Sequence, residues 1–169
     1  MSLRTSLPFA TALTALLLAP LIARTDPTAD ARKAIQASYD HADAAVTKKD
    51  VNTAVSNRTS DYTTTGPHGE TLTATQEREA LTQLMKSLKS IKATTSIQAI
   101  KLKGATATVI AKEHADMFLT SPQSPKPAHL IVDDVVQDTW IKTGKGWRIN
   151  HSKTLKESAT QDGKPVPIL

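Results

Sequence analysis

The stretch that decides the fold is DTWIKTGKGWRINHS, residues 138–152 of a 169-residue chain. It predicts two antiparallel strands joined at TGKG, because glycines occupy the turn and β-branched or aromatic residues flank it on both sides. Each strand carries one tryptophan, Trp140 on the first and Trp147 on the second. The stretch therefore predicts the closing hairpin of an antiparallel sheet.

Two registers of this hairpin are open, and they place Asp138 and His151 differently. With a two-residue loop at 144–145, Trp140 pairs with Ile149. Asp138 then pairs with His151 on one face, orients its imidazole and raises its basicity, which makes the two residues candidate catalytic groups for proton abstraction. With a three-residue loop, the register slips and they lie on opposite faces. The alternative role is a half-exposed polar pair that only satisfies its own groups.

Strand character dominates the second half of the chain. Four runs rich in β-branched residues and separated by turn signals predict an antiparallel meander, and they cover residues 92–102, 105–119, 128–142 and 146–155. The last strands have about 10 to 14 residues, longer than usual, which favours a strongly curved sheet. The polar, proline-containing residues 157–169 are predicted to form a flexible tail.

The first half of the mature chain is predicted to be mainly helical. Residues 30–49 carry apolar side chains at helical spacing, and Asp50 can cap a short second helix. Thr73 and Gln76 resemble a capping box ahead of a third helix, which follows a small hairpin at 61–73. The order predicts an α+β domain with three N-terminal helices packed on a strongly curved antiparallel sheet.

Residues 1–29 predict a signal peptide and a short linker ahead of one domain at 30–156. The apolar run 7–23 follows a basic residue, and prolines interrupt it, which is unfavourable for a membrane span of about 20 residues. Cleavage after Ala23 or Ala31 frees the chain from the membrane, and an uncleaved anchor is the alternative. We therefore predict an exported protein, periplasmic or secreted.

The composition argues against several classes of site. The formal net charge of +5 comes from lysines scattered among carboxylates, so we predict no nucleic-acid partner. The chain has no cysteine, which removes disulfides, thiol nucleophiles and thiolate metal ligands. The five histidines have no paired spacing, and no glycine-rich phosphate loop occurs. We predict neither a metal nor a cofactor.

Several single residues, spaced along the chain, resemble the sequence pattern of a known family. Asp50 opens the second helix, the pair Asp61-Tyr62 starts the first strand, and a glycine hairpin leads into the third helix. In the closing hairpin, Trp147 follows a glycine turn and His151 comes four residues later. Together these residues resemble the nuclear transport factor 2-like superfamily, particularly its SnoaL-like branch.

The resemblance implies a cone-shaped α+β domain whose curved sheet and helices enclose a pocket. Relatives use such a pocket as isomerases, dehydratases and polyketide cyclases, or as binding modules. It implies pocket positions for Tyr62 and Asp61, and their alternative role is to start the hairpin. Lys153 stands where many relatives carry a second histidine, which argues against chemistry that needs two imidazoles.

Glu113 and Trp140 complete the candidate ligand-binding residues. Glu113 shares a strand face with apolar residues, so it either projects a desolvated carboxyl into an apolar wall or lies at a solvated position. We predict that the pocket binds a small, mostly apolar ligand. The alternative is an isomerase-, dehydratase- or cyclase-like enzyme that uses an acid and a base in the pocket.

The strand IVDDVVQDTWIK, residues 131–142, is apolar on both faces. Val132, Val136 and Trp140 alternate with a second apolar set on the other face that includes Ile131 and Val135. Helices can cover only one of these faces. We therefore predict a homodimer formed through the outer sheet face.

Overall fold

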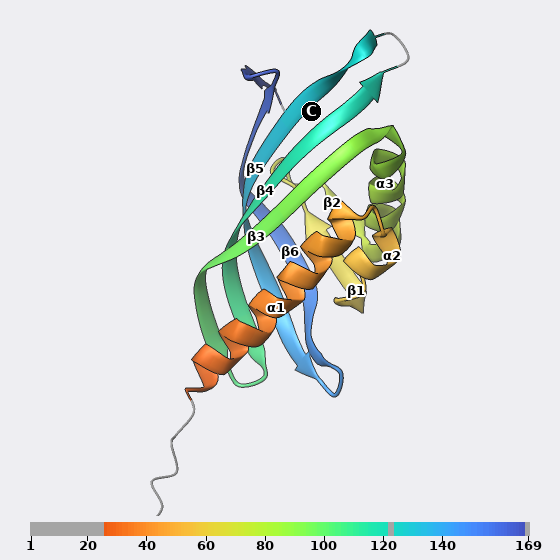
Figure 1. Ribbon diagram of the computed structural model, residues 1–169. Coiled ribbons are helices and arrows are strands. Elements are labelled where there is room, and N and C mark those ends of the chain that lie inside the picture. The colour runs from red at the N-terminus through yellow and green to blue at the C-terminus, as the bar shows by residue number, and fades with distance from the viewer. Residues whose placement is uncertain (1–25, 122–123, 168–169) are drawn as a thin grey trace, which may run out of the picture.

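The computed structural model describes residues 26–121 and 124–167 (Figure 1). The predicted signal peptide and linker, residues 1–29, lie almost wholly outside these ranges, and export stays a prediction. The first helix already begins at Pro27, slightly before the predicted domain boundary. Among the described helices, none combines the length and the apolarity that crossing a membrane requires.

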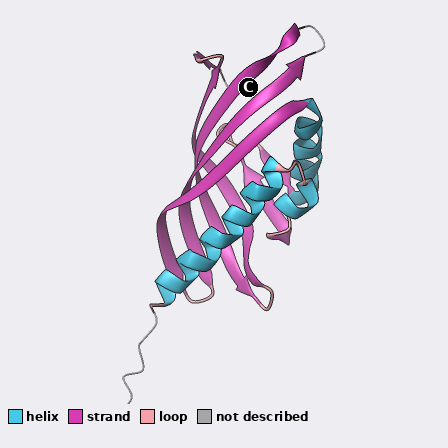
Figure 2. Cartoon of the chain, in the orientation of Figure 1, coloured by secondary structure: helices cyan, strands magenta, loops and turns pink. Residues whose placement is uncertain are grey.

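Helices occur only in the first half of the described chain. Figure 2 shows the long strands side by side, with the longest helix lying across them. This arrangement confirms the predicted α+β class with a curved sheet. In sequence order the elements are α1 (Pro27–Thr47), α2 (Val51–Ala54), β1 (Arg58–Thr65), β2 (Thr71–Thr73), α3 (Ala74–Ser87), β3 (Leu88–Lys103), β4 (Thr106–Ser121), β5 (Ser124–Thr143), β6 (Gly146–Gln161) and β7 (Lys164–Val166).

Side-chain caps set where the helices begin. Asp26 caps α1 ahead of a proline at the first turn, and Asp50 caps α2 by accepting a bond from the Thr53 backbone N–H at 3.1 Å. The predicted capping box of α3 is present in both directions between Thr73 and Gln76. The predicted caps at Asp50, Thr73 and Gln76 are confirmed, and they set the first residues of α2 and α3.

The sheet has the strand order β2-β1-β6-β5-β4-β3, with β7 paired to β6. Strands β3 to β6 form the predicted antiparallel meander. The sheet is nevertheless mixed, because β1 runs parallel to β6. Only α1 and α2 precede the first strand, so the prediction of three N-terminal helices on an antiparallel sheet holds in part.

β-Bulges account for the curvature of the long strands. The strands β3 to β6 have 16 to 20 residues, and their register shifts leave Gln98 on β3 and both Asn150 and Leu155 on β6 as extra residues. An extra residue bends its strand and increases the local twist. The bent sheet partly wraps around α1 instead of lying flat against it (Figure 1).

The closing hairpin combines features of both predicted registers. Next to the turn, Trp140 lies opposite Ile149, as a two-residue loop requires. The extra residue Asn150 then shifts the pairing by one position. Because successive side chains point to opposite faces of a strand, Asp138 and His151 lie on opposite faces. The predicted direct pair of Asp138 with His151 is therefore wrong, and the bulge is the reason.

The C-terminal segment extends the sheet. β6 continues to Gln161, and a tight turn at Asp162 and Gly163 leads into β7, so the prediction of a flexible tail is wrong for residues 157–166. Both turn residues have positive φ, of 50° and 79°. Asp-Gly is a strong hairpin signal because this turn requires positive φ at both residues. The polar composition of the segment instead favoured the prediction of a flexible tail.

The core consists of two separate clusters of buried side chains. The large cluster lies where α1 meets the middle of the sheet and contains Ile35, Tyr39, Tyr62, Ile97, Ala107, Val109, Ala111, Val136, Trp140 and Ile149. The small cluster lies near α3 and contains Met85, Leu88, Ile91 and Met117. The two clusters leave a space between them, and the candidate site occupies it.

Candidate functional site

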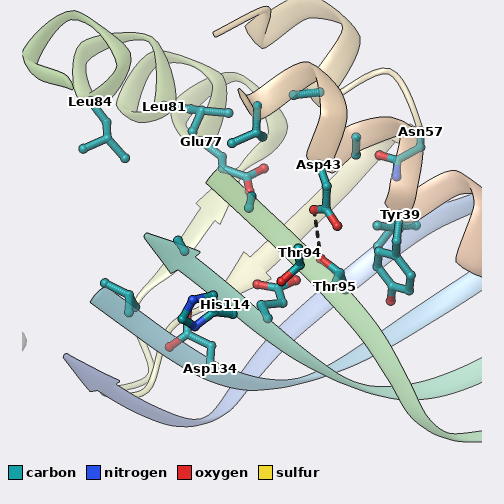
Figure 3. Close-up of a pocket in the computed structure, with 18 of the residues that line it drawn as sticks. Tyr39, Asp43, Asn57, Glu77, Leu81, Leu84, Thr94, Thr95, His114 and Asp134 are labelled. Carbon is teal, nitrogen blue, oxygen red and sulfur yellow. Dashed lines mark hydrogen bonds between the residues drawn. The ribbon is translucent and has the colours of Figure 1, made fainter. Parts of the chain in front are cut away.

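A cavity of about 580 Å³ lies between α1, α3 and the sheet (Figure 3). Its size falls within the range of about 300–1,000 Å³ that small-molecule sites occupy. Its place follows from the order of residues along the central strands. On β4, Glu113 comes between Ala111 of the large cluster and Ala115 beside the small one, and on β5 Asp134 comes between Val136 and Val132.

One part of the cavity wall is apolar. Leu81 and Leu84 extend from α3 toward the strands (Figure 3), and Val46 on α1 adds a third aliphatic side chain. Ala115 and Val132 contribute from the sheet. Leu84 is 36% exposed, so this wall also borders the opening to solvent. The apolar wall suits the hydrocarbon part of a ligand.

Four carboxyl groups also line the cavity. Asp43 on α1, Glu77 on α3, Glu113 on β4 and Asp134 on β5 all line the cavity. The guanidinium of Arg58 also lines it, and its Nη1 lies 2.6 Å from Oε2 of Glu77. Burial raises the pKa of Glu77, and the charge of Arg58 opposes that rise.

Asp43 is tied to the sheet by a hydrogen bond. The hydroxyl of Thr95 donates to Oδ1 of Asp43 at 3.0 Å, and Figure 3 shows this contact between α1 and β3. Burial raises the pKa of Asp43, and the bond from Thr95 opposes the rise. This carboxyl therefore has a structural partner that limits its movement.

Glu113 has no such partner. Within the described residues, no hydrogen bond or ion pair reaches its carboxyl, although the side chain lies in the cavity wall. Burial, together with the nearby charges of Asp138, Asp134 and Asp43, raises the pKa of Glu113 to about 8, and the charge of Arg58 opposes that rise. At neutral pH this carboxyl is mostly protonated.

Asp134 lies directly opposite Glu113 across the pairing of β4 and β5. Burial and the charges of Glu157 and Asp133 raise its pKa to about 6. Its Oδ1 is buried, and it has no hydrogen-bond partner among the described residues. Near pH 7 Glu113 is therefore mostly protonated and Asp134 mostly ionised, so an acid lies beside a base.

A buried hydrogen-bond network lies under the end of the cavity formed by the large cluster. Tyr39 lines the cavity and donates its hydroxyl to Oδ2 of Asp138, and Trp140 donates its indole N–H to the Tyr39 oxygen at 3.1 Å. The two aromatic rings pack edge to face with centroids 5.0 Å apart. Asp138 is 1% exposed, and burial raises its pKa against the hydrogen bonds from Ser152 and Tyr39.

His151 lies away from this network. Its backbone pairs with Thr139, and its Nδ1 lies 2.9 Å from the hydroxyl of Thr63 on β1. It is not among the residues that line the cavity. The structure therefore separates the two candidate catalytic residues and gives Asp138 a tyrosine as its partner.

The candidate ligand-binding residues fall in three different places. Glu113 lines the cavity. Trp140 and Tyr62 are buried in the large cluster, where Tyr62 packs its ring under the guanidinium of Arg58 at 4.8 Å. Asp61 is exposed on β1, where the hydroxyl of Thr59 lowers its pKa. Trp140, Tyr62 and Asp61 therefore do not line the cavity.

Sequence reasoning missed four charged residues of the lining, although three of them carried a usable signal. Asp134 has the same strand parity as Val132 and Val136, which is the signal that singled out Glu113. Glu77 shares a helical face with Leu81, and Asp43 lies one turn after Tyr39. Only Arg58 had no distinguishing pattern.

In residues 26–121 and 124–167, no group of three or more histidine, aspartate or glutamate side chains has an arrangement that could hold a metal ion. The absence of a metal and of a cofactor stays a prediction.

No protein-family model matches the chain, and no curated protein matches it. Solved structures do match its fold. A conserved protein from Planctomyces limnophilus has a TM-score of 0.66 at 16% identity, over 82% of this chain and 98% of that one. A candidate scytalone dehydratase from Novosphingobium aromaticivorans has a TM-score of 0.65 at 14% identity, over 80% of this chain and 91% of that one.

A third solved structure names the fold. A nuclear transport factor 2-like superfamily protein from Salmonella enterica has a TM-score of 0.59 at 19% identity, over 75% of this chain and 91% of that one. The chain therefore has the nuclear transport factor 2-like fold, as the resemblance implied. Similarity at this level of identity establishes the fold and leaves the activity to the residues of the site.

The raised pKa of Glu113 predicts how stability depends on pH. The folded state keeps this proton up to about pH 8, whereas the unfolded chain releases it near its ordinary value of 4.5. Stability is therefore lost as pH rises through this window, by up to about 1.4 kcal/mol per pH unit for one group. Glu113→Gln is expected to flatten the dependence and to be more stable than the wild type at pH 8.

Urea unfolding followed by circular dichroism between pH 5 and pH 9 measures this effect. Glu79→Gln is the matched control, because it replaces a carboxyl by the same amide at an exposed position of α3 that does not line the cavity. Parallel stability curves for the wild type and Glu113→Gln would show that Glu113 is ordinary and solvated.

Proposed function

We propose that this domain binds a small, mostly apolar molecule in the cavity between its two core clusters. The observation that carries the proposal is the cavity of about 580 Å³, which brings an apolar wall from α1 and α3 against polar groups from the sheet. Binding sites for small molecules combine these two features, since the apolar wall supplies affinity and a few polar groups set orientation.

The positions of the polar groups predict how a ligand is oriented in the cavity. Tyr39 lies at one end of the cavity, and its hydroxyl proton is already donated to Asp138. Glu113 and Asp134 lie on the sheet side, and Leu81 and Leu84 lie on the helix side. A ligand is therefore expected to place its apolar body under α3 and its polar end on the strands.

Filling the cavity tests this proposal. Ala42 on α1 lines the cavity and is half-buried, so Ala42→Phe places a ring in the ligand's space. A panel of steroids, aromatic ketones and aromatic amines is screened by thermal shift on the wild type. A ligand at a hundredfold excess over its Kd stabilises the folded state by about 2.7 kcal/mol, and Ala42→Phe is expected to lose this effect.

Ala37→Phe is the matched control, because Ala37 is exposed on the same helix and is not part of the lining. It is expected to keep the full shift. Equal shifts in both variants, or no shift of the wild type with any probe, would contradict binding in this cavity.

A second candidate function is acid–base catalysis of the isomerase, dehydratase or cyclase kind. The pair Glu113 and Asp134 favours it, because one carboxyl with a pKa of about 8 lies beside another with a pKa of about 6. Such a pair can donate and accept protons at neutral pH. The candidate dehydratase with this fold adds general support.

Deuterium exchange decides between binding and catalysis. An aromatic ketone that binds is incubated with the protein in D2O, and exchange at the carbon next to the carbonyl is followed by NMR. Catalysis predicts exchange above the buffer rate that Glu113→Gln slows by about 100-fold or more. Exchange at the buffer rate would leave the protein as a binder.

We also propose a homodimer formed through the outer sheet face. Ile131, Val135 and Ile141 point away from the helices and remain only half-buried in the single chain, and Phe118 on β4 is 39% exposed. A second copy would cover these side chains. Light scattering at micromolar concentration is expected to give the mass of a dimer and, for Val135→Lys, that of a monomer. A monomeric wild type would refute the dimer.

A further inference from the structure

We propose that the ligand of this cavity is a cation, a small amine with an apolar body, whose ammonium group is held between Glu113 and Asp134. This inference rests on the proposed binding function and names its chemical class. It comes from the balance of charges in the cavity and from the carboxyl oxygens that the protein leaves without partners.

The charges that line the cavity do not balance. Four carboxyls face it, from Asp43, Glu77, Glu113 and Asp134, whereas Arg58 is the one guanidinium in the lining. That guanidinium is already engaged by Glu77 at 2.6 Å. The lining therefore has an excess of acidic groups that a ligand cation would offset.

Other basic side chains near the lining are engaged elsewhere. His114 contributes to the lining, but its Nδ1 lies 3.1 Å from Oδ1 of Asp133, which also has Lys112 at 3.5 Å. Lys49 donates its ammonium to the backbone oxygen of Leu88. Within the described residues, no protein cation lies in an ion pair with Glu113 or Asp134.

Two carboxyls with unpartnered oxygens lie side by side on the sheet. Glu113 and Asp134 are cross-strand neighbours, and neither the Glu113 carboxyl nor Oδ1 of Asp134 has a hydrogen-bond partner among the described residues. Glu157 lies opposite Asp134 on β6 and adds a further negative charge nearby. An ammonium group has three donors and no acceptor, so it matches a pair of acceptor carboxylates.

The apolar wall defines the rest of the ligand. Leu81 and Leu84 on α3 lie across the cavity from Asp134 (Figure 3). An aryl or alkyl body packed there would remove apolar surface from water while its ammonium end stays on the strands. A neutral molecule of the same shape would gain the same burial but would leave the carboxyls unneutralised.

A cation should also change the protonation of the site. Burial raises the pKa of Glu113, as do the charges of Asp138 and Asp134 on β5 and Asp43 on α1, and Arg58 opposes the rise. Glu77 also lines the cavity, from α3. A bound ammonium lowers the pKa of Glu113, so uptake of the amine at pH 7 releases a proton. Affinity for the amine is expected to rise by up to about tenfold per pH unit until about pH 8 and then to level off.

The test compares two probes of one shape. 1-Naphthylmethylamine and 1-naphthalenemethanol differ in the charged group and share the ring system. Isothermal titration calorimetry on the full chain at pH 7.5 is expected to show at least tenfold tighter binding of the amine. Titration in phosphate and in Tris at pH 7 is expected to show proton release with the amine and none with the alcohol, because the apparent heat then depends on the buffer.

Three variants test whether the preference for the amine and the proton release come from Glu113 and from this cavity. Glu113→Gln is expected to lose the proton release and most of the preference for the amine while it still binds the alcohol, and exposed Glu79→Gln keeps both. Ala42→Phe is expected to bind neither probe. Persistence of the preference in Glu113→Gln, or amine binding by Ala42→Phe, would overturn the inference.

The outcomes separate this inference from the proposed function. Equal affinity for the two probes in the wild type, lost in Ala42→Phe, would support a cavity for apolar ligands and overturn the cation. Binding of neither probe would count against the cation, and the wider probe panel then decides the proposed function. Amine binding without proton release would overturn the assignment to Glu113.

Discussion

The structure depends on one buried hydrogen bond, from the Tyr39 hydroxyl to the Asp138 carboxyl, which fastens α1 to the centre of the bent sheet. Asp138 is 1% exposed, and a carboxyl buried so deeply is tolerated only with donors around it. Trp140 completes the arrangement by donating to the same tyrosine oxygen. Because this contact sets how closely α1 approaches the strands, it also fixes one end of the cavity.

The cavity is a consequence of two cores that do not merge. The large cluster closes the space near Trp140, and the small cluster closes it near Met85 and Met117. The intervening positions on the strands carry Glu113 and Asp134, which cannot fill a core without partners. Apolar residues at these two positions would favour stability. A buried acidic pair is unfavourable for stability, and exceptions of this kind are expected at functional sites.

Glu113 and Asp134 restrict the possible functions more than the shared fold does. Solved structures with the same fold include a candidate dehydratase and conserved proteins for which no activity is named. Acid–base chemistry and cation binding draw on the same two carboxyls, since a raised pKa marks both a proton donor and a site that lacks its counter-charge. The two uses differ in whether a proton moves within the ligand or leaves the site when the ligand binds.

Local patterns in the sequence determined the helix caps, the antiparallel meander, the turn of the closing hairpin and the strand face that Glu113 shares with apolar residues, because each depends on neighbours along one strand or helix. Tertiary structure decided the rest. The extra residue Asn150 moved His151 to the face opposite Asp138, and no periodic pattern marks a bulge. Arg58, Asp43 and Glu77 reach the cavity from three different elements. Their meeting depends on how α1 and α3 pack on a curved sheet, and spacing along the chain carries no information about that geometry.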